Sequence, residues 1–120
     1  LARALSDHYR VICPDIVGRG DSDWLANPML YGIPQYVADM MALITQLGLG
    51  KVDWFGTSMG GLIGIFMAAQ EHSPIRRMIL NDVGPRIEPA ALSRLGDYVG
   101  KPLSFPTKKE GLIFLTFYIV

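Results

Sequence analysis

Cysteine is almost absent from this chain of 120 residues, and neither sign of charge is in excess. The one cysteine, Cys13, excludes an internal disulfide and fits a reducing compartment, so we expect a cytoplasmic protein. The 11 basic side chains are balanced by 11 acidic ones, which leaves no basic footprint for nucleic acid and no polybasic patch for anionic lipid. These absences favour a small-molecule partner, and the length allows one domain at most.

Targeting and membrane signals are missing as well. The chain begins at Leu1 in a helix-like stretch, with neither an initiator Met nor a signal peptide. Residues 112–120 are apolar but too few to span a bilayer. Since both ends look cut, we expect a fragment of a larger protein. The apolar tail has three interpretations: a lid helix over an oily substrate, a helix stripped of its partner, or an artefact at the cut.

The order of the expected elements predicts an α/β fold. Short apolar runs at residues 9–13, 52–55 and 75–81 predict three parallel strands, with helices at 34–47 and 62–70 between them. Helices between strands imply βαβ crossovers, and functional groups in such sheets lie beyond the carboxyl ends of the strands. The polar residues expected at that edge are Asp15, Ser58 and Asp82.

The helix expected at residues 34–47 has one apolar face. Pro34 suits its first turn, and Gly48 ends it. The residues expected to be buried recur at spacings of three and four: Val37, Met40, Met41, Ile44 and Leu47.

The segment Gly56-Thr57-Ser58-Met59-Gly60-Gly61 joins the second strand to the second helix. A serine between glycines, in a sharp turn from strand to helix, is typical of a nucleophile elbow. We expect strained backbone angles at Ser58 and an exposed hydroxyl. We also expect glycine to be required at 56 and 60, because side chains there would collide with the chain that passes on both sides. The N–H of Met59, at the helix start, would point at a substrate oxyanion with the helix dipole behind it. An ordinary βα turn is the alternative.

With Asp15-x-x-Gly18-x-Gly20-x-Ser22 followed by this Gly-x-Ser-x-Gly segment, the chain resembles the α/β-hydrolase superfamily. The resemblance is to the branch of esterases, lactonases and carbon–carbon-bond hydrolases. It implies a partial α/β-hydrolase fold in which residues 1–86 form the central part of the core and 87–120 the beginning of the lid. It implies that Ser58 is the nucleophile and that the Met59 backbone N–H is one oxyanion donor. We expect no cofactor and no metal.

The chain departs from the family in several places. The family's first three strands, with the loop of the second oxyanion donor, and its last two strands have no counterpart here. The catalytic His that follows the family's final strand has none either, and His8 and His72 are expected at the surface, out of reach of Ser58. Asp82 follows the strand after the elbow, a position from which some relatives supply the triad acid. It is either that acid or a loop residue that caps local N–H groups.

One absent strand bears on the folding of the sheet. The resemblance places a strand between residues 9–13 and 52–55 that this sequence does not contain. Because unpaired backbone groups in a buried strand cost about 1–3 kcal/mol each, we expect those two segments to pair directly.

These features predict a serine hydrolase that acts on an ester, lactone, thioester or activated carbon–carbon bond through an acyl-enzyme on Ser58. Its substrate is expected to be a small apolar or acyl-bearing molecule. Without a base, Ser58 is an ordinary alcohol, so these residues alone should be inactive. The competing hypothesis is a non-catalytic ligand-binding or interaction module that keeps the fold, and a third is a fragment without function.

Overall fold

The structure, a computed structural model, describes residues 1–84 together with residues 86, 93, 106 and 107. The chain divides into two units, Leu1–Val83 and Gly84–Val120, and every helix and strand with described bounds lies in the first. The lid expected at 87–120, with its apolar tail at 112–120, falls almost entirely outside the described residues.

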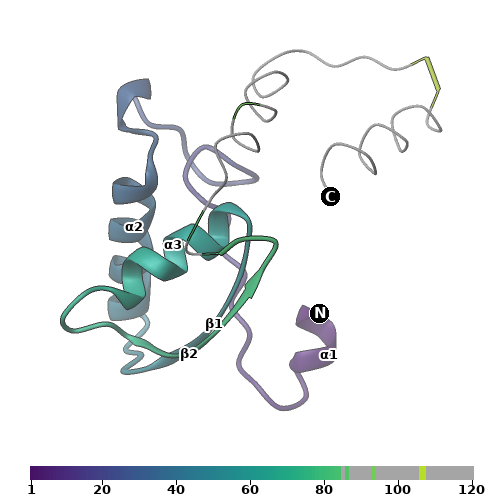
Figure 1. Cartoon of the computed structure of the whole chain (residues 1–120), viewed down its shortest axis with the longest axis vertical. Helices are drawn as coiled ribbons and strands as arrows, with labels where there is room; N and C mark the ends of the chain where they lie inside the picture. Colours follow the sequence, from purple (N-terminus) through teal and green to yellow (C-terminus); the bar gives the residue numbers. More distant parts are fainter. Residues whose placement is uncertain (85, 87–92, 94–105, 108–120) are drawn as a thin grey trace. The chain divides into compact units, whose positions relative to one another are not determined.

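Helices and strands alternate in the second half of the first unit (Figure 1). β1 and β2 pair in parallel, α3 joins them and packs on both, and α2 packs on α3. The described part of the chain is therefore an α/β arrangement, as predicted. In chain order the elements are the helix α1 (Ala2–Leu5), the short 3-10 helix η1 (Pro28–Leu30), α2 (Ile33–Gln46), β1 (Val52–Thr57), α3 (Met59–Ala68) and β2 (Ile75–Asn81).

The helix α2 lies within one residue of its predicted bounds. Pro34 is in its first turn, where a missing N–H removes no helical hydrogen bond. Gly48 follows its end with a φ of 66°, a conformation that glycine adopts without steric penalty. The N–H of Gly48 donates to the carbonyl of Thr45 at 3.0 Å, and that of Leu49 to the carbonyl of Ile44 at 3.1 Å. These two bonds form the Schellman motif, which satisfies the last carbonyls of the helix.

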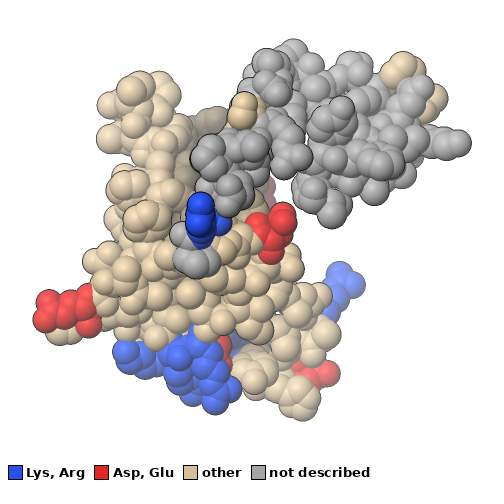
Figure 2. Space-filling model, in the orientation of Figure 1, with Lys and Arg blue, Asp and Glu red and all other residues tan. Residues whose placement is uncertain are grey.

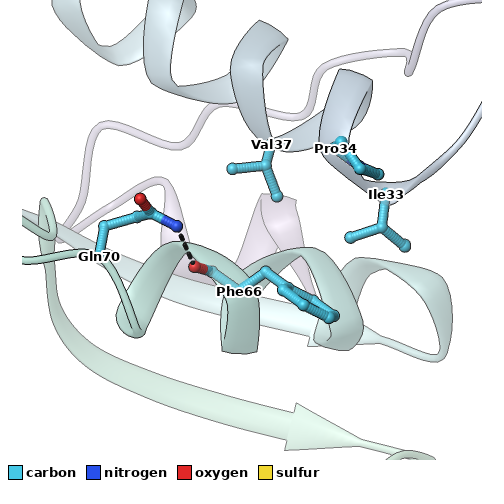
Figure 3. Close-up of a pocket in the computed structure, with 5 residues that line it drawn as sticks. All are labelled: Ile33, Pro34, Val37, Phe66 and Gln70. Carbon is cyan, nitrogen blue, oxygen red and sulfur yellow. Dashed lines mark hydrogen bonds between the residues drawn. The ribbon is translucent and has the colours of Figure 1, made fainter. Parts of the chain in front are cut away.

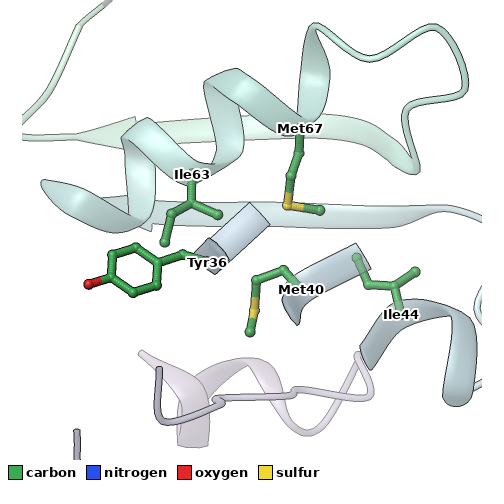
Figure 4. Packing of buried hydrophobic residues seen from close by; sticks show 5 residues of the cluster. All are labelled: Tyr36, Met40, Ile44, Ile63 and Met67. Atoms are coloured by element: carbon green, nitrogen blue, oxygen red, sulfur yellow. The ribbon is translucent and has the colours of Figure 1, made fainter. Parts of the chain in front are cut away.

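The core lies between α2 and α3 and contains side chains from both helices (Figure 4). Met40 and Ile44 of the predicted face are buried, whereas Val37, Met41 and Leu47 are half-buried. The face also includes Tyr36, which was not predicted and is 4% exposed. Its spacing of four from Met40 is the signal that could have identified it. The buried cluster consists of Tyr36, Met40, Ile44, Ile63 and Met67.

The two strands have one covered and one bare face. Residues alternate along β1, so that Val52, Trp54 and Gly56 lie on the more buried side. On the opposite side Phe55 pairs with Ile79 of β2, and these two side chains are 46% and 61% exposed. Among the described residues no element covers that side.

The prediction of a third strand at residues 9–13 is wrong for this chain. The described sheet has two strands, β1 and β2, and residues 9–13 belong to no strand. The direct pairing expected between 9–13 and β1 is wrong as well. That expectation treated the backbone of the segment as buried, but Tyr9, Arg10, Ile12 and Cys13 are all exposed. Water can satisfy their backbone groups, so leaving them out of a sheet carries no such penalty.

An ion pair joins the beginnings of the two strands. The guanidinium of Arg76 donates to both carboxylate oxygens of Asp53, at 2.9 and 2.7 Å. This hydrogen bonding holds the pKa of Asp53 below its ordinary value of 3.8. Both side chains face solvent, so the pair contributes little to the free energy of unfolding. Lys and Arg side chains gather on that side of the described unit (Figure 2).

Candidate active site

The backbone of Ser58 has the strained geometry predicted for it. Ser58 lies between β1 and α3 with φ 49° and ψ −115°, which is uncommon for any residue other than glycine. Hydrogen bonds hold it on both sides. Its N–H donates to the carbonyl of Asn81 at the end of β2, at 3.0 Å, and its carbonyl accepts from the N–H of Gly61 in α3, at 2.9 Å. The strain is therefore maintained by the sheet on one side and the helix on the other.

The hydroxyl of Ser58 and the N–H of Met59 are both available to a ligand. Ser58 is exposed, and its hydroxyl makes no hydrogen bond within the part of the chain that the structure describes. Met59 is the first residue of α3, and its N–H likewise donates to no described residue. The first N–H groups of a helix have no partner inside it, and they lie at the positive end of its dipole. An oxygen that becomes negative beside Ser58 can be stabilised there.

The glycines of the elbow are required at positions that differ in part from those expected. A Cβ on Gly56 would lie 2.5 Å from the carbonyl carbon of Gly60 and 2.6 Å from the nitrogen of Gly61, as predicted. A Cβ on Gly60 would meet no described atom within 4 Å, so the expected collision there is wrong. The crowded position is Gly61, where a Cβ would collide with Val83. The helix turns Gly60 away from the strands and Gly61 toward them.

Trp54 reinforces the turn, and sequence reasoning missed it. Its indole N–H donates to the carbonyl of Gly60 at 2.9 Å. The ring also lies against Gly64, where a Cβ would be 2.5 Å from the indole nitrogen. Trp54 thus bridges β1 and the first two turns of α3. The signal that could have indicated this contact was Trp54, four residues before Ser58, together with Gly64, six residues after Ser58.

The loop that contains Asp15 and Ser22 is held by side-chain hydrogen bonds. The carboxylate of Asp15 accepts from the N–H of Asp21 at 3.0 Å, and the hydroxyl of Ser22 donates to the Asp15 carbonyl at 2.7 Å. Gly18 and Gly20 have φ values of 77° and 52°. Asp15 is thereby engaged within its own loop, which makes it a structural residue.

Arg19, between those two glycines, connects this loop to the elbow. Its guanidinium donates to the hydroxyl of Tyr36 at 3.0 Å and to the carbonyl of Val17 at 3.1 Å. It also lies 3.9 Å from the sulfur of Met59. The sequence alone did not reveal this link, because residue 19 and residue 59 come together only in the fold.

Asp82 lies at the carboxyl end of β2, beside the elbow. It directly follows Asn81, whose carbonyl accepts the Ser58 N–H. It is exposed and has a φ of 56°, the second positive value at a residue other than glycine in the described part of the chain. The alternative role for Asp82 was to cap local N–H groups. Its side chain forms no hydrogen bond with a described residue.

His8 and His72 are both exposed, as predicted. His72 follows the C-terminal end of α3, whereas Ser58 precedes its first residue. A helix of 10 residues separates the two by roughly 15 Å. His8 lies in the turn that follows α1, far along the chain from the elbow. His72 is therefore not placed to accept a proton from Ser58, and the expectation that His8 is out of reach stays a prediction.

Ser58 lines neither of two surface cavities in the described unit. One, of about 330 Å³, lies between α2 and α3 and has mostly apolar walls (Figure 3): Ile33, Pro34, Val37, Phe66 and Gln70. The other, of about 410 Å³, is more polar and is bounded by the Asp15 loop and α2. Within the described ranges, no cluster of His, Cys, Asp or Glu is suited to a metal ion. Likewise, no helix there is both long and apolar enough to cross a bilayer.

Comparison with known proteins gives a consistent result. A family profile described as "alpha/beta hydrolase fold" matches residues 1–106. A crystal structure of an alpha/beta hydrolase from Novosphingobium aromaticivorans superposes with a TM-score of 0.79 at 38% identity, covering 97% of this chain and 43% of that one.

Two curated relatives are named as hydrolases. A 3-hydroxybutyrate-oligomer hydrolase from Cupriavidus necator is 55% identical over 115 residues, which cover 96% of this chain and 39% of the relative. A 2-hydroxy-6-oxo-2,4-heptadienoate hydrolase from Pseudomonas putida is 36% identical over 63% of this chain and 27% of the relative. The chain therefore spans well under half the length of these relatives.

Proposed function

The chain belongs to the alpha/beta hydrolase fold family, and we propose that it is the central part of a serine hydrolase with Ser58 as nucleophile. The observation that carries this proposal is the strained, exposed Ser58 at the start of α3, next to an N–H without a partner among the described residues. Residues 1–86 would supply the middle of the core and residues 87–120 the beginning of a lid. We call the longer protein that contains these residues the full-length polypeptide.

The reaction proposed is acyl transfer. The Ser58 oxygen attacks the carbonyl carbon of an ester, lactone or thioester, or of a ketone next to an activated carbon–carbon bond, and gives its proton to a base. The oxyanion that forms is stabilised by the Met59 N–H and the positive end of α3. The leaving group departs with a proton, and water then releases the acid from the acyl-enzyme. Among these substrates we favour esters of hydroxy acids, because the relative with 55% identity is named for 3-hydroxybutyrate oligomers.

Asp82 is proposed as the acid that orients the base. Two observations support this role. Asp82 directly follows Asn81, whose carbonyl accepts the Ser58 N–H, and its side chain is exposed. Its left-handed backbone also turns the chain directly after the strand. The base itself would be a histidine outside this chain, since His72 lies beyond the far end of α3 and His8 is an exposed residue of the turn after α1. The second oxyanion donor would lie outside it as well.

The 120 residues alone should therefore be inactive. We expect the full-length polypeptide to hydrolyse small hydroxy-acid esters, and the isolated chain to give no rate above background, because losing the base removes several orders of magnitude. Release of acid, followed in a pH-stat for both proteins, checks this. Equal activity in the isolated chain would contradict the division of the site, and a full-length polypeptide that binds esters without hydrolysing any would favour a binding module.

A further inference from the structure

The Asp15 loop is built so that Arg19 projects toward the elbow. Gly18 and Gly20 on either side have positive φ, and a Cβ on Gly18 would lie 2.6 Å from the Tyr31 ring. A Cβ on Gly20 would collide with the Asp15 carboxylate. Because these close contacts fix the loop, the guanidinium of Arg19 has a defined place against α2 and α3.

Half of the Arg19 guanidinium is already engaged. One terminal nitrogen donates to the Val17 carbonyl and to the Tyr36 hydroxyl, which uses both of its hydrogens. The other terminal nitrogen makes one weak contact, to the Met59 sulfur at 3.9 Å. A guanidinium has five N–H donors. Its second edge is thus left with donors that no described residue accepts, while the first edge holds the group in position.

Arg19 also has no carboxylate partner in the part of the chain that the structure describes. The contrast is with Arg76, whose guanidinium is bound at both ends by Asp53. Met59, the residue that Arg19 contacts, directly follows Ser58 and carries the proposed oxyanion donor. The positive charge of Arg19 is therefore separated from the backbone of Met59 by the length of the Met59 side chain.

We propose that Arg19 receives the free carboxylate of the substrate, so that the site selects esters that carry a terminal acid over neutral esters. The proposal rests on the proposed function of Ser58. A planar guanidinium with an open edge matches a carboxylate, with which it forms charge-assisted hydrogen bonds. A linear oligomer of a hydroxy acid has one such carboxylate at its end, and its ester bonds lie further along the same molecule.

Binding to the Ser58→Ala full-length polypeptide tests the proposal without relying on hydrolysis. By calorimetry we expect the linear dimer of 3-hydroxybutyrate to bind about tenfold more tightly than its methyl ester. In the double variant with Arg19→Met this preference should disappear, whereas affinity for the methyl ester stays the same. Arg19→Lys should keep part of the preference, because the charge remains and the fork is lost.

Arg10→Met is the matched control, since it removes the same charge at an exposed position where the side chain forms no hydrogen bond or ion pair with a described residue. It should leave the preference for the acid unchanged. Equal binding of acid and ester before Arg19 is changed, no binding of either, or a preference that survives Arg19→Met would each overturn the proposal. Because binding is measured in a protein that cannot form an acyl-enzyme, this result stands apart from the test of Ser58 as nucleophile.

Discussion

Ester hydrolysis by the full-length polypeptide should fall about 10³- to 10⁶-fold in kcat when Ser58 is replaced by Ala. In the proposed reaction the Ser58 hydroxyl forms the acyl-enzyme, whereas the N–H of Met59 stabilises charge without forming a covalent bond. KM should change little, because the hydroxyl contributes little to ground-state binding. Steady-state kinetics on a hydroxy-acid ester measures both constants.

Ser6→Ala serves as the comparison for this variant. Ser6 is also an exposed serine, and its hydroxyl donates only to the nearby carbonyl of Arg3 at 2.8 Å. Its replacement should leave kcat unchanged. A Ser58→Ala protein that folds and keeps more than about a tenth of the kcat would mean that the nucleophile lies elsewhere.

Replacing Gly56 by Ala should destabilise the protein by about 3 kcal/mol or more. The new methyl group would lie 2.5 Å from the carbonyl carbon of Gly60 and 2.6 Å from the nitrogen of Gly61, and these are backbone atoms of a hydrogen-bonded helix. They cannot move aside by a change of rotamer. Urea unfolding of the full-length polypeptide, followed by circular dichroism, measures the difference.

Gly60→Ala provides the matched test within the same motif. Its Cβ would meet no described atom, and alanine favours a helix by about 1 kcal/mol over glycine. The stability of this variant should be equal to or greater than that of the parent. Similar losses at Gly56 and Gly60 would show that α3 does not turn Gly60 away from the strands.

The elbow could be predicted from the sequence because its determinants are local. A strand, a serine and a helix follow one another within a few residues, and the strain at Ser58 follows from the sharp turn between them. The strand continues to Thr57 and the helix begins at Met59, beyond the predicted bounds of 52–55 and 62–70. The bounds of α2 were predictable for the same reason, since Pro34 and Gly48 act within one turn of it.

The failures concern contacts between residues far apart in the chain. Whether 9–13 forms a strand depends on a partner strand, and the sequence cannot place one that it does not contain. The sequence motif does not show which of Gly60 and Gly61 is crowded. Only the direction of α3 decides which one faces Val83. The contact of Arg19 with Met59 joins residues 40 positions apart, so no local pattern indicates it.

The most direct test of Ser58 as the nucleophile is covalent labelling. The full-length polypeptide is treated with an active-site-directed fluorophosphonate, and the modified peptide is identified by mass spectrometry. We expect one adduct, on Ser58, and none when the 120-residue chain is treated alone. An adduct on a different side chain, or ester hydrolysis by a protein that acquires no adduct on Ser58, would contradict the assignment of the elbow as the reacting centre.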